Sequence, residues 1–131
     1  MNESVTKVLA ENMWSIATFS EEDVNVVPVG FKTLADNGTL LVGDIMLDTT
    51  IKNVNANGRI AVSAYDPKTS EGYQVKGSAM YFTEGEVLDS MRAAAMEKFN
   101  GAVSVKGVIV ITPEKVIVTT PGPDNKKEVN N

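Results

Sequence analysis

The chain has 131 residues, 43% of them hydrophobic, a net charge of −5, and neither histidine nor cysteine. That length predicts one domain, residues 1–131, with enough apolar side chains for a core. The acidic balance disfavours nucleic acid and anionic membranes as partners, because both require a basic protein face. Without histidine or cysteine, the chain cannot form disulfides, zinc–thiolate sites, Ser-His-Asp triads or a histidine-ligated heme site.

The sequence also shows no pattern typical of a transmembrane segment or of a signal peptide. No apolar stretch of 18 residues is present, and the start of the chain lacks a basic segment followed by a long apolar one. We therefore expect a cytoplasmic protein. Any redox chemistry would have to come from a bound organic cofactor.

Hydrophobic periodicity predicts a mainly β chain with short helices. The expected elements, in chain order, are a helix over 3–12, strands over 14–19, 24–34 and 39–43, a helix over 48–57, strands over 59–65 and 72–83, a helix over 86–99, and strands over 105–112 and 116–120. About six or seven such strands are typical of a Greek-key-like barrel. Residues 121–131 are polar, and we expect them to form a flexible tail.

Turn residues and one apolar stripe refine these elements. Asn37-Gly38 favours a hairpin turn, since both residues accept positive φ angles, and Pro113 to Lys115 predicts a second turn. In the helix over 86–99, Val87 and Leu88 begin an apolar stripe that we expect to pack in the core, so truncating either should cost stability.

The strand over 24–34 contains Pro28 and Gly30. Proline lacks the ladder donor, and glycine lets another group approach the backbone. These residues therefore indicate an edge or bulged segment, which either faces a ligand or partner or is only a structural bulge. Trp14 is open to two interpretations as well: an apolar wall of a site, or a core residue.

A threonine pair begins the helix over 48–57, with Asp48 as its expected N-cap and Gly58 as its stop. The first amides of a helix have no internal partners, so Thr49 and Thr50 offer hydroxyl and backbone donors to a phosphate. Lys52 adds positive charge and Asn53 an amide. The alternative is ordinary helix capping by Asp and Thr.

Four stretches together resemble the FMN-binding split-barrel family, the pyridoxamine 5′-phosphate oxidase-like group, over roughly residues 8–121. They are Asn25-Val-Val-Pro-Val-Gly-Phe31, Gly43-Asp-Ile-Met46, Thr49-Thr-Ile-Lys-Asn-Val54 and Gly72-Tyr-Gln-Val-Lys-Gly77. The resemblance implies a split β-barrel that forms a homodimer with FMN at the interface.

The same resemblance implies roles for individual residues. The FMN phosphate would lie near Thr50 and Asn53. The isoalloxazine or ribityl chain would lie beside four consecutive residues, Pro28, Val29, Gly30 and Phe31, with Lys32 near the entrance. Lys76 would line the site or the dimer interface, although a lysine between apolar positions is also typical of a solvated face.

The chain departs from the family pattern at the phosphate. Many relatives carry a lysine where this chain has Thr49. Two carboxylates are nearby, that of Asp48 and that of Asp44, which the resemblance places among the candidate cofactor-binding residues. Carboxylates near a dianionic phosphate are unfavourable, and Lys52 or Lys32 would offset that repulsion without eliminating it. Nothing in the sequence separates FMN from a deazaflavin.

These features predict an FMN-binding flavoprotein acting as an oxidoreductase or electron carrier. The alternative is a split-barrel dimer without flavin, serving as a small-ligand-binding or structural protein. Pyridoxamine 5′-phosphate oxidation itself is disfavoured, because that enzyme uses arginines and a histidine in characteristic places, whereas this chain has only Arg59 and Arg92.

Overall fold

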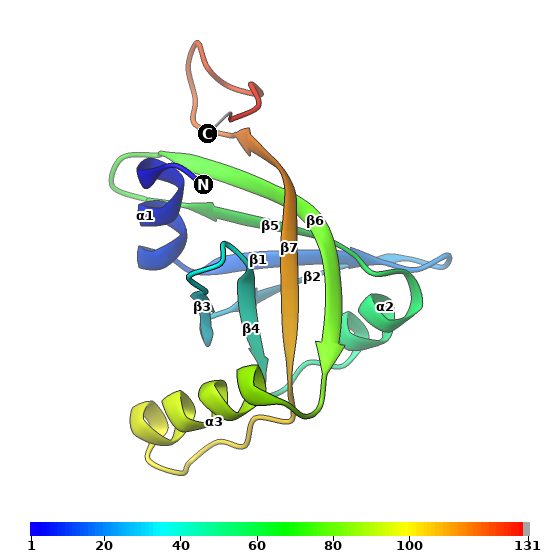
Figure 1. The fold of residues 1–131 in the computed structure, drawn as a ribbon. Coiled ribbons are helices and arrows are strands. Elements are labelled where there is room, and N and C mark those ends of the chain that lie inside the picture. Colours follow the sequence, from blue (N-terminus) through cyan, green and yellow to red (C-terminus); the bar gives the residue numbers. More distant parts are fainter. Residues whose placement is uncertain (130–131) are drawn as a thin grey trace.

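The computed structural model describes residues 1–129, which form one antiparallel sheet and three helices. The elements are α1 (Glu3–Glu11), β1 (Trp14–Phe19), β2 (Val24–Val29), β3 (Lys32–Leu34), β4 (Leu40–Asp44), α2 (Thr49–Asn57), β5 (Arg59–Tyr65), β6 (Gly72–Phe82), α3 (Glu86–Phe99) and β7 (Gly107–Val118). The seven strands follow the order β2-β1-β5-β6-β7-β4-β3, and the sheet curls into a split barrel (Figure 1). The predicted fold class is confirmed.

The predicted strand over 24–34 is divided between the two edges of the sheet. β2 pairs with β1, whereas β3 pairs with β4. Gly30 and Phe31 connect these two edge strands directly. At this point the two edges of the curled sheet are therefore joined by the chain itself. Pro28 stays within β2, opposite Ser15, because an edge strand tolerates the missing donor.

The predicted turn at Pro113 to Lys115 is wrong, because β7 runs unbroken through it. Lys76 of β6 pairs with Lys115 and the next residue, Gly77, pairs with Pro113, which leaves Glu114 as an extra residue. This β-bulge absorbs the proline without ending the strand. Gly77 permits it, since a Cβ there would collide with the Thr112 carbonyl oxygen.

The main core fills the inside of the curled sheet. Its fully buried side chains include Trp14, which is 1% exposed and donates from its indole Nε1 to the Leu9 carbonyl at 2.7 Å. α1 contributes Val5, Val8 and Leu9 to the same cluster. The core interpretation of Trp14 is therefore confirmed.

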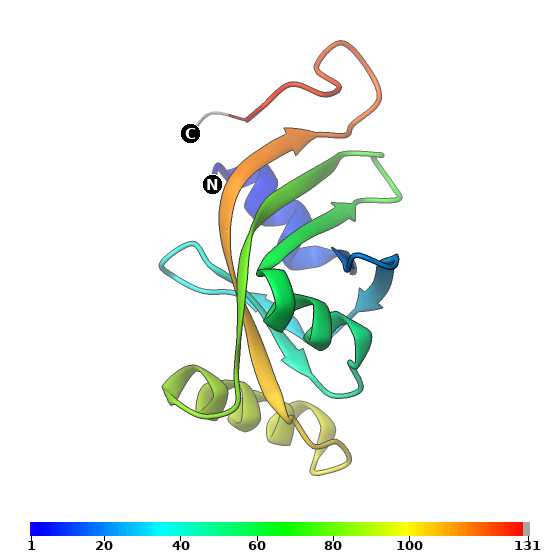
Figure 2. The same cartoon turned by 90° about the vertical axis from the view of Figure 1, so that its right-hand side faces the viewer.

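A second apolar cluster lies on the other face of the sheet. Leu40 and Val42 of β4 belong to the main core, whereas Leu41 packs with Leu88 and Met91 of α3. Alternate residues of a strand face opposite sides, so α3 covers the outer face of β4 and β7. Figure 2 shows α3 across the end of the sheet remote from α1. In the described part of the chain, no helix is long and apolar enough to cross a membrane.

The segment after β7 turns back along the strand it leaves. The Val118 amide donates to the Lys127 carbonyl at 2.9 Å, and the Val129 amide donates to the Val116 carbonyl at 2.8 Å. The backbone of residues 121–129 thus has partners, and its flexibility stays a prediction. The last two residues of the predicted tail, 130–131, lie outside the described residues.

Candidate functional site

A pocket of about 270 Å³ opens where β2 gives way to β3. One wall is the β2–β3 connection and the other is the loop that follows β4. The lining residues are Val27, Pro28, Val29, Gly30, Phe31, Gly43, Ile45, Met46 and Leu47. All four residues predicted to lie beside a flavin ring, Pro28 to Phe31, therefore come together in one mostly apolar pocket.

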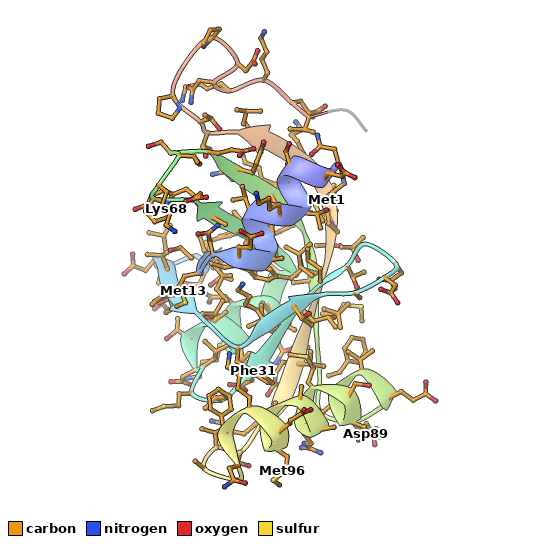
Figure 3. All side chains as sticks on the ribbon, turned by 90° about the vertical axis from the view of Figure 1, so that its left-hand side faces the viewer. Met1, Met13, Phe31, Lys68, Asp89 and Met96 are labelled. Atoms are coloured by element: carbon orange, nitrogen blue, oxygen red, sulfur yellow. The ribbon has the colours of Figure 1, made fainter. Side chains whose placement is uncertain are left out.

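Phe31 connects the pocket wall to β4 and to α3. Its ring covers Gly43, leaving no room for a Cβ there, and its carbonyl accepts from the Gly43 amide at 3.0 Å. The ring also meets Phe99 edge-on, with 5.7 Å between centroids. Phe31 lies between the sheet and α3 (Figure 3).

Asp44 holds the second wall of the pocket in place. The side chain is 2% exposed, and its two carboxylate oxygens accept from the Leu47 amide at 2.9 Å and from the Tyr81 hydroxyl at 2.6 Å. Burial, aided by this bond and by the Asp44 charge, raises the pKa of Tyr81 to about 12. Asp44 was predicted as a cofactor-binding residue, and its oxygens are engaged by the protein.

The side chains of Thr50 and Asn53 are turned into the protein. Thr50, 1% exposed, accepts from the Asn25 side-chain amide at 3.1 Å, and Asn53, 5% exposed, donates to the Thr18 hydroxyl at 3.0 Å. They anchor α2 to β1 and β2. Gly58 ends α2 in the left-handed conformation, as expected, whereas Asp48 makes no side-chain capping bond.

A second hollow, a groove of about 660 Å³, runs along α2. The residues that line it are Phe19, Ser20, Glu21, Glu22, Thr49, Lys52, Asn53, Ala56 and Asn57. Three of the residues predicted to contact phosphate, Thr49, Lys52 and Asn53, lie here. Glu21 and Glu22 are a finding that sequence reasoning missed, because only the fold brings the β1–β2 turn beside α2.

The two remaining predicted lysines line neither hollow. Lys32 donates from Nζ to the Leu9 carbonyl at 3.0 Å and lies 5.0 Å from the centroid of the Trp14 ring. Burial lowers its pKa, and the nearby charge of Lys98 lowers it further. Lys76 is exposed on the outer face of β6, opposite Ala61 and Lys115.

Exposed apolar side chains gather on the outer face of β1 and β2. We call Phe19, Val24, Val26 and Pro28 the β1–β2 apolar face; the exposed fractions of Val24 and Val26 are 79% and 66%. Cross-strand pairing continues this face from Val26 through Ala17 and Ala61 to Lys76. The alternation of Val24 and Val26 in the sequence is the signal that could have revealed it.

Several known proteins resemble this chain. An uncharacterized protein of Methanocaldococcus jannaschii is 31% identical over 130 residues, covering 97% of this chain and 86% of that protein. HupZ of Group A Streptococcus has a similar structure, with a TM-score of 0.82, 22% identity and coverage of 95% and 98% of the two chains. An FMN-binding protein of Syntrophomonas wolfei has a TM-score of 0.79, 15% identity and coverage of 92% and 87%.

The same fold accompanies other ligands. An F420 reductase matches with a TM-score of 0.68, 16% identity and coverage of 88% of this chain and 98% of that one. A heme-binding protein of Mycobacterium smegmatis matches with a TM-score of 0.70 and 21% identity, covering 97% of this chain and 56% of that one. The signature of the family described as pyridoxamine 5′-phosphate oxidase matches residues 1–122, so this chain belongs to that family.

Proposed function

We propose that this protein binds FMN as a homodimer and acts as a flavin-dependent oxidoreductase or electron carrier. The observation that carries the proposal is the pocket between Pro28–Phe31 and the loop after β4. Its apolar walls suit the faces of an aromatic ring system, and the flavin would supply the redox chemistry. Membership of a family whose fold also serves an FMN-binding protein and an F420 reductase supports it.

The residues fit the two ends of FMN unequally. Pro28, Val29 and Leu47 present apolar surface at the ring end. At the phosphate end, Thr49 offers a hydroxyl beside the first amides of α2, which favour an anion. The positive charge of Lys52 is shared with Asp48, at 3.5 Å. The protein would therefore hold the flavin ring better than the phosphate.

A second copy of the chain would complete the pocket. Its volume of about 270 Å³ falls below the roughly 300–1,000 Å³ typical of sites that enclose a small molecule. The β1–β2 apolar face continues from it through Pro28, and exposed apolar patches of this kind mark contact surfaces. A partner seated there would close the pocket and place Lys76 within the interface.

Absorption spectroscopy tests the proposal. The purified protein is measured from about 300 to 500 nm, before and after FMN is added and the excess removed by gel filtration. We expect flavin bands that elute with the protein at about one per chain, followed by bleaching when a nicotinamide donor is supplied. A protein that stays colourless after FMN is added would contradict the proposal.

The second candidate is a dimer of the same fold that binds no flavin and serves as a small-ligand-binding or structural protein. The acidic groove beside α2 is the observation that favours it. Oxidation of pyridoxamine 5′-phosphate is not proposed, because Arg59 pairs with Glu114 at 3.0 Å and Arg92 donates to the Val105 carbonyl at 3.0 Å. Both arginines are thus engaged away from the pocket.

A further inference from the structure

The groove beside α2 is acidic at the place where the family resemblance puts the cofactor phosphate. Glu21 and Glu22, on the β1–β2 turn, line the groove together with Thr49. Asp48 precedes Thr49 at the start of α2. Two carboxylates therefore line the groove together with the Thr49 hydroxyl, and a third, that of Asp48, belongs to the residue just before Thr49.

Positive charge does not balance these carboxylates. Lys52 is the basic residue among those that line the groove, and its Nζ lies 3.5 Å from an Asp48 carboxylate oxygen. Its side chain is 74% exposed, so its charge is screened by solvent as well as shared. A dianionic phosphate would gain little from Lys52 and would be repelled by Glu21 and Glu22.

The polar side chains that the resemblance assigns to the phosphate are also buried and hydrogen-bonded within the protein, with exposed fractions of 1% for Thr50 and 5% for Asn53. The Thr50 hydroxyl accepts from Asn25, and the Asn53 amide donates to Thr18. Turning either toward a ligand would leave a buried polar group without its partner, at a free-energy cost. The favourable contacts left for a phosphate are the Thr49 hydroxyl and the amides of the first turn.

We propose that this protein selects a flavin by its ring and not by its phosphate, and binds uncharged riboflavin about as tightly as FMN. The inference rests on the proposed function, since it takes a flavin as the ligand. Attraction by the helix start and repulsion by the carboxylates nearly cancel at an exposed site, while the ring contacts are identical for both molecules.

Two titrations followed by flavin fluorescence test this inference, one with riboflavin and one with FMN. We expect the two dissociation constants to agree within about threefold at low salt. Raising the NaCl concentration from about 0.05 M to about 0.5 M should leave the ratio of the two dissociation constants nearly unchanged, because salt screens the attraction by the helix start and the repulsion by the carboxylates alike.

A charge variant sharpens the test. Thr49→Lys, which places a cation in the groove, should raise the preference for FMN over riboflavin by about tenfold. The matched control is Asn55→Lys, which adds the same charge at an exposed position of α2 that does not line the groove. That variant should keep the wild-type ratio.

The possible outcomes distinguish a failure of this inference from a failure of the proposed flavin binding. If wild-type protein binds FMN more than about threefold more tightly than riboflavin, the phosphate is recognised and the inference is wrong, while flavin binding stands. Equal effects of Thr49→Lys and Asn55→Lys would also overturn it. If neither flavin binds, the proposed function and the inference both fall.

Discussion

At the scale of single residues, polar pairs buried in the protein hold the walls of the site. Asp44 with Tyr81 fixes the loop that lines the pocket, and Asn53 with Thr18 fixes α2. Within residues 1–129, every buried side-chain nitrogen or oxygen has a hydrogen-bond partner. Because an unpaired buried group is costly, these pairs determine which polar atoms stay available to a ligand.

The Tyr81–Asp44 pair predicts a pH dependence of stability. The pKa of Tyr81 is raised from 10.0 to about 12 by burial and by Asp44, and burial and Glu71 raise that of Tyr73 to about 12 as well. Since ionised tyrosine is disfavoured in the folded state, this contribution to stability is complete below the unfolded pKa of 10.0 and is lost as the pH rises to about 12.

Replacing Tyr81 by phenylalanine tests this pH dependence. At about pH 8, Tyr81→Phe should lower the free energy of unfolding by about 1.5–3 kcal/mol, because a bond to a buried carboxylate is lost. The two proteins should converge in stability as the pH approaches 12. Urea denaturation at a series of pH values measures both curves, and a constant difference between them would show that the Tyr81 bond is not what titrates.

At the scale of elements, two adjacent apolar residues of α3 differ in burial, although the sequence predicts the same core position for both. Leu88 is fully buried against the outer face of the sheet, whereas Val87 is 42% exposed. The expectation that both residues pack in the core is therefore wrong for Val87. The direction each side chain takes depends on how α3 rotates onto β4 and β7, which periodicity alone left ambiguous.

The two truncations form a matched pair. Leu88→Ala should lower the free energy of unfolding by about 2–5 kcal/mol, because it leaves a cavity in the second cluster. Val87→Ala should change it by no more than about 0.5 kcal/mol. Urea denaturation of both variants measures the difference, and similar losses would mean that α3 packs in another orientation.

At the scale of the whole molecule, the β1–β2 apolar face predicts where two copies meet. Val26→Glu should convert a dimer into monomers and weaken flavin retention, because the contact would bury an unpaired charge. Met96→Glu on α3 is the matched control, since Met96 is 62% exposed and Val26 is 66% exposed. Light scattering coupled to gel filtration measures the mass of each variant.

Two results would contradict the proposed dimer contact. A dimer that survives Val26→Glu would place the interface on another surface. A wild-type protein that elutes as a monomer would remove the dimer from the proposal altogether. In either case the pocket beside Pro28 would have to be judged as the site of a single chain.

The sequence by itself determined the elements whose signals are local. The strands Trp14–Phe19 and Arg59–Tyr65 and the helix Glu86–Phe99 match their predicted bounds. Gly38, with a φ angle of 89°, occupies the expected hairpin turn. These features follow from periodicity and turn chemistry over a few neighbouring residues, which the chain carries wherever it folds.

Only the tertiary structure decided what depends on residues far apart in the chain. Pro113 continues a strand because Gly77 of β6 allows a bulge opposite it. Asn53 is turned inward because the Thr18 hydroxyl lies within 3.0 Å of its amide. Glu21 and Glu22 come to oppose α2 because β1 and β2 fold against that helix. The electrostatic potential at a bound phosphate is the sum of contributions from all nearby charges, including those distant in the sequence. The sequence therefore identified the start of α2 as the candidate phosphate segment, and the fold decided which charges lie beside it.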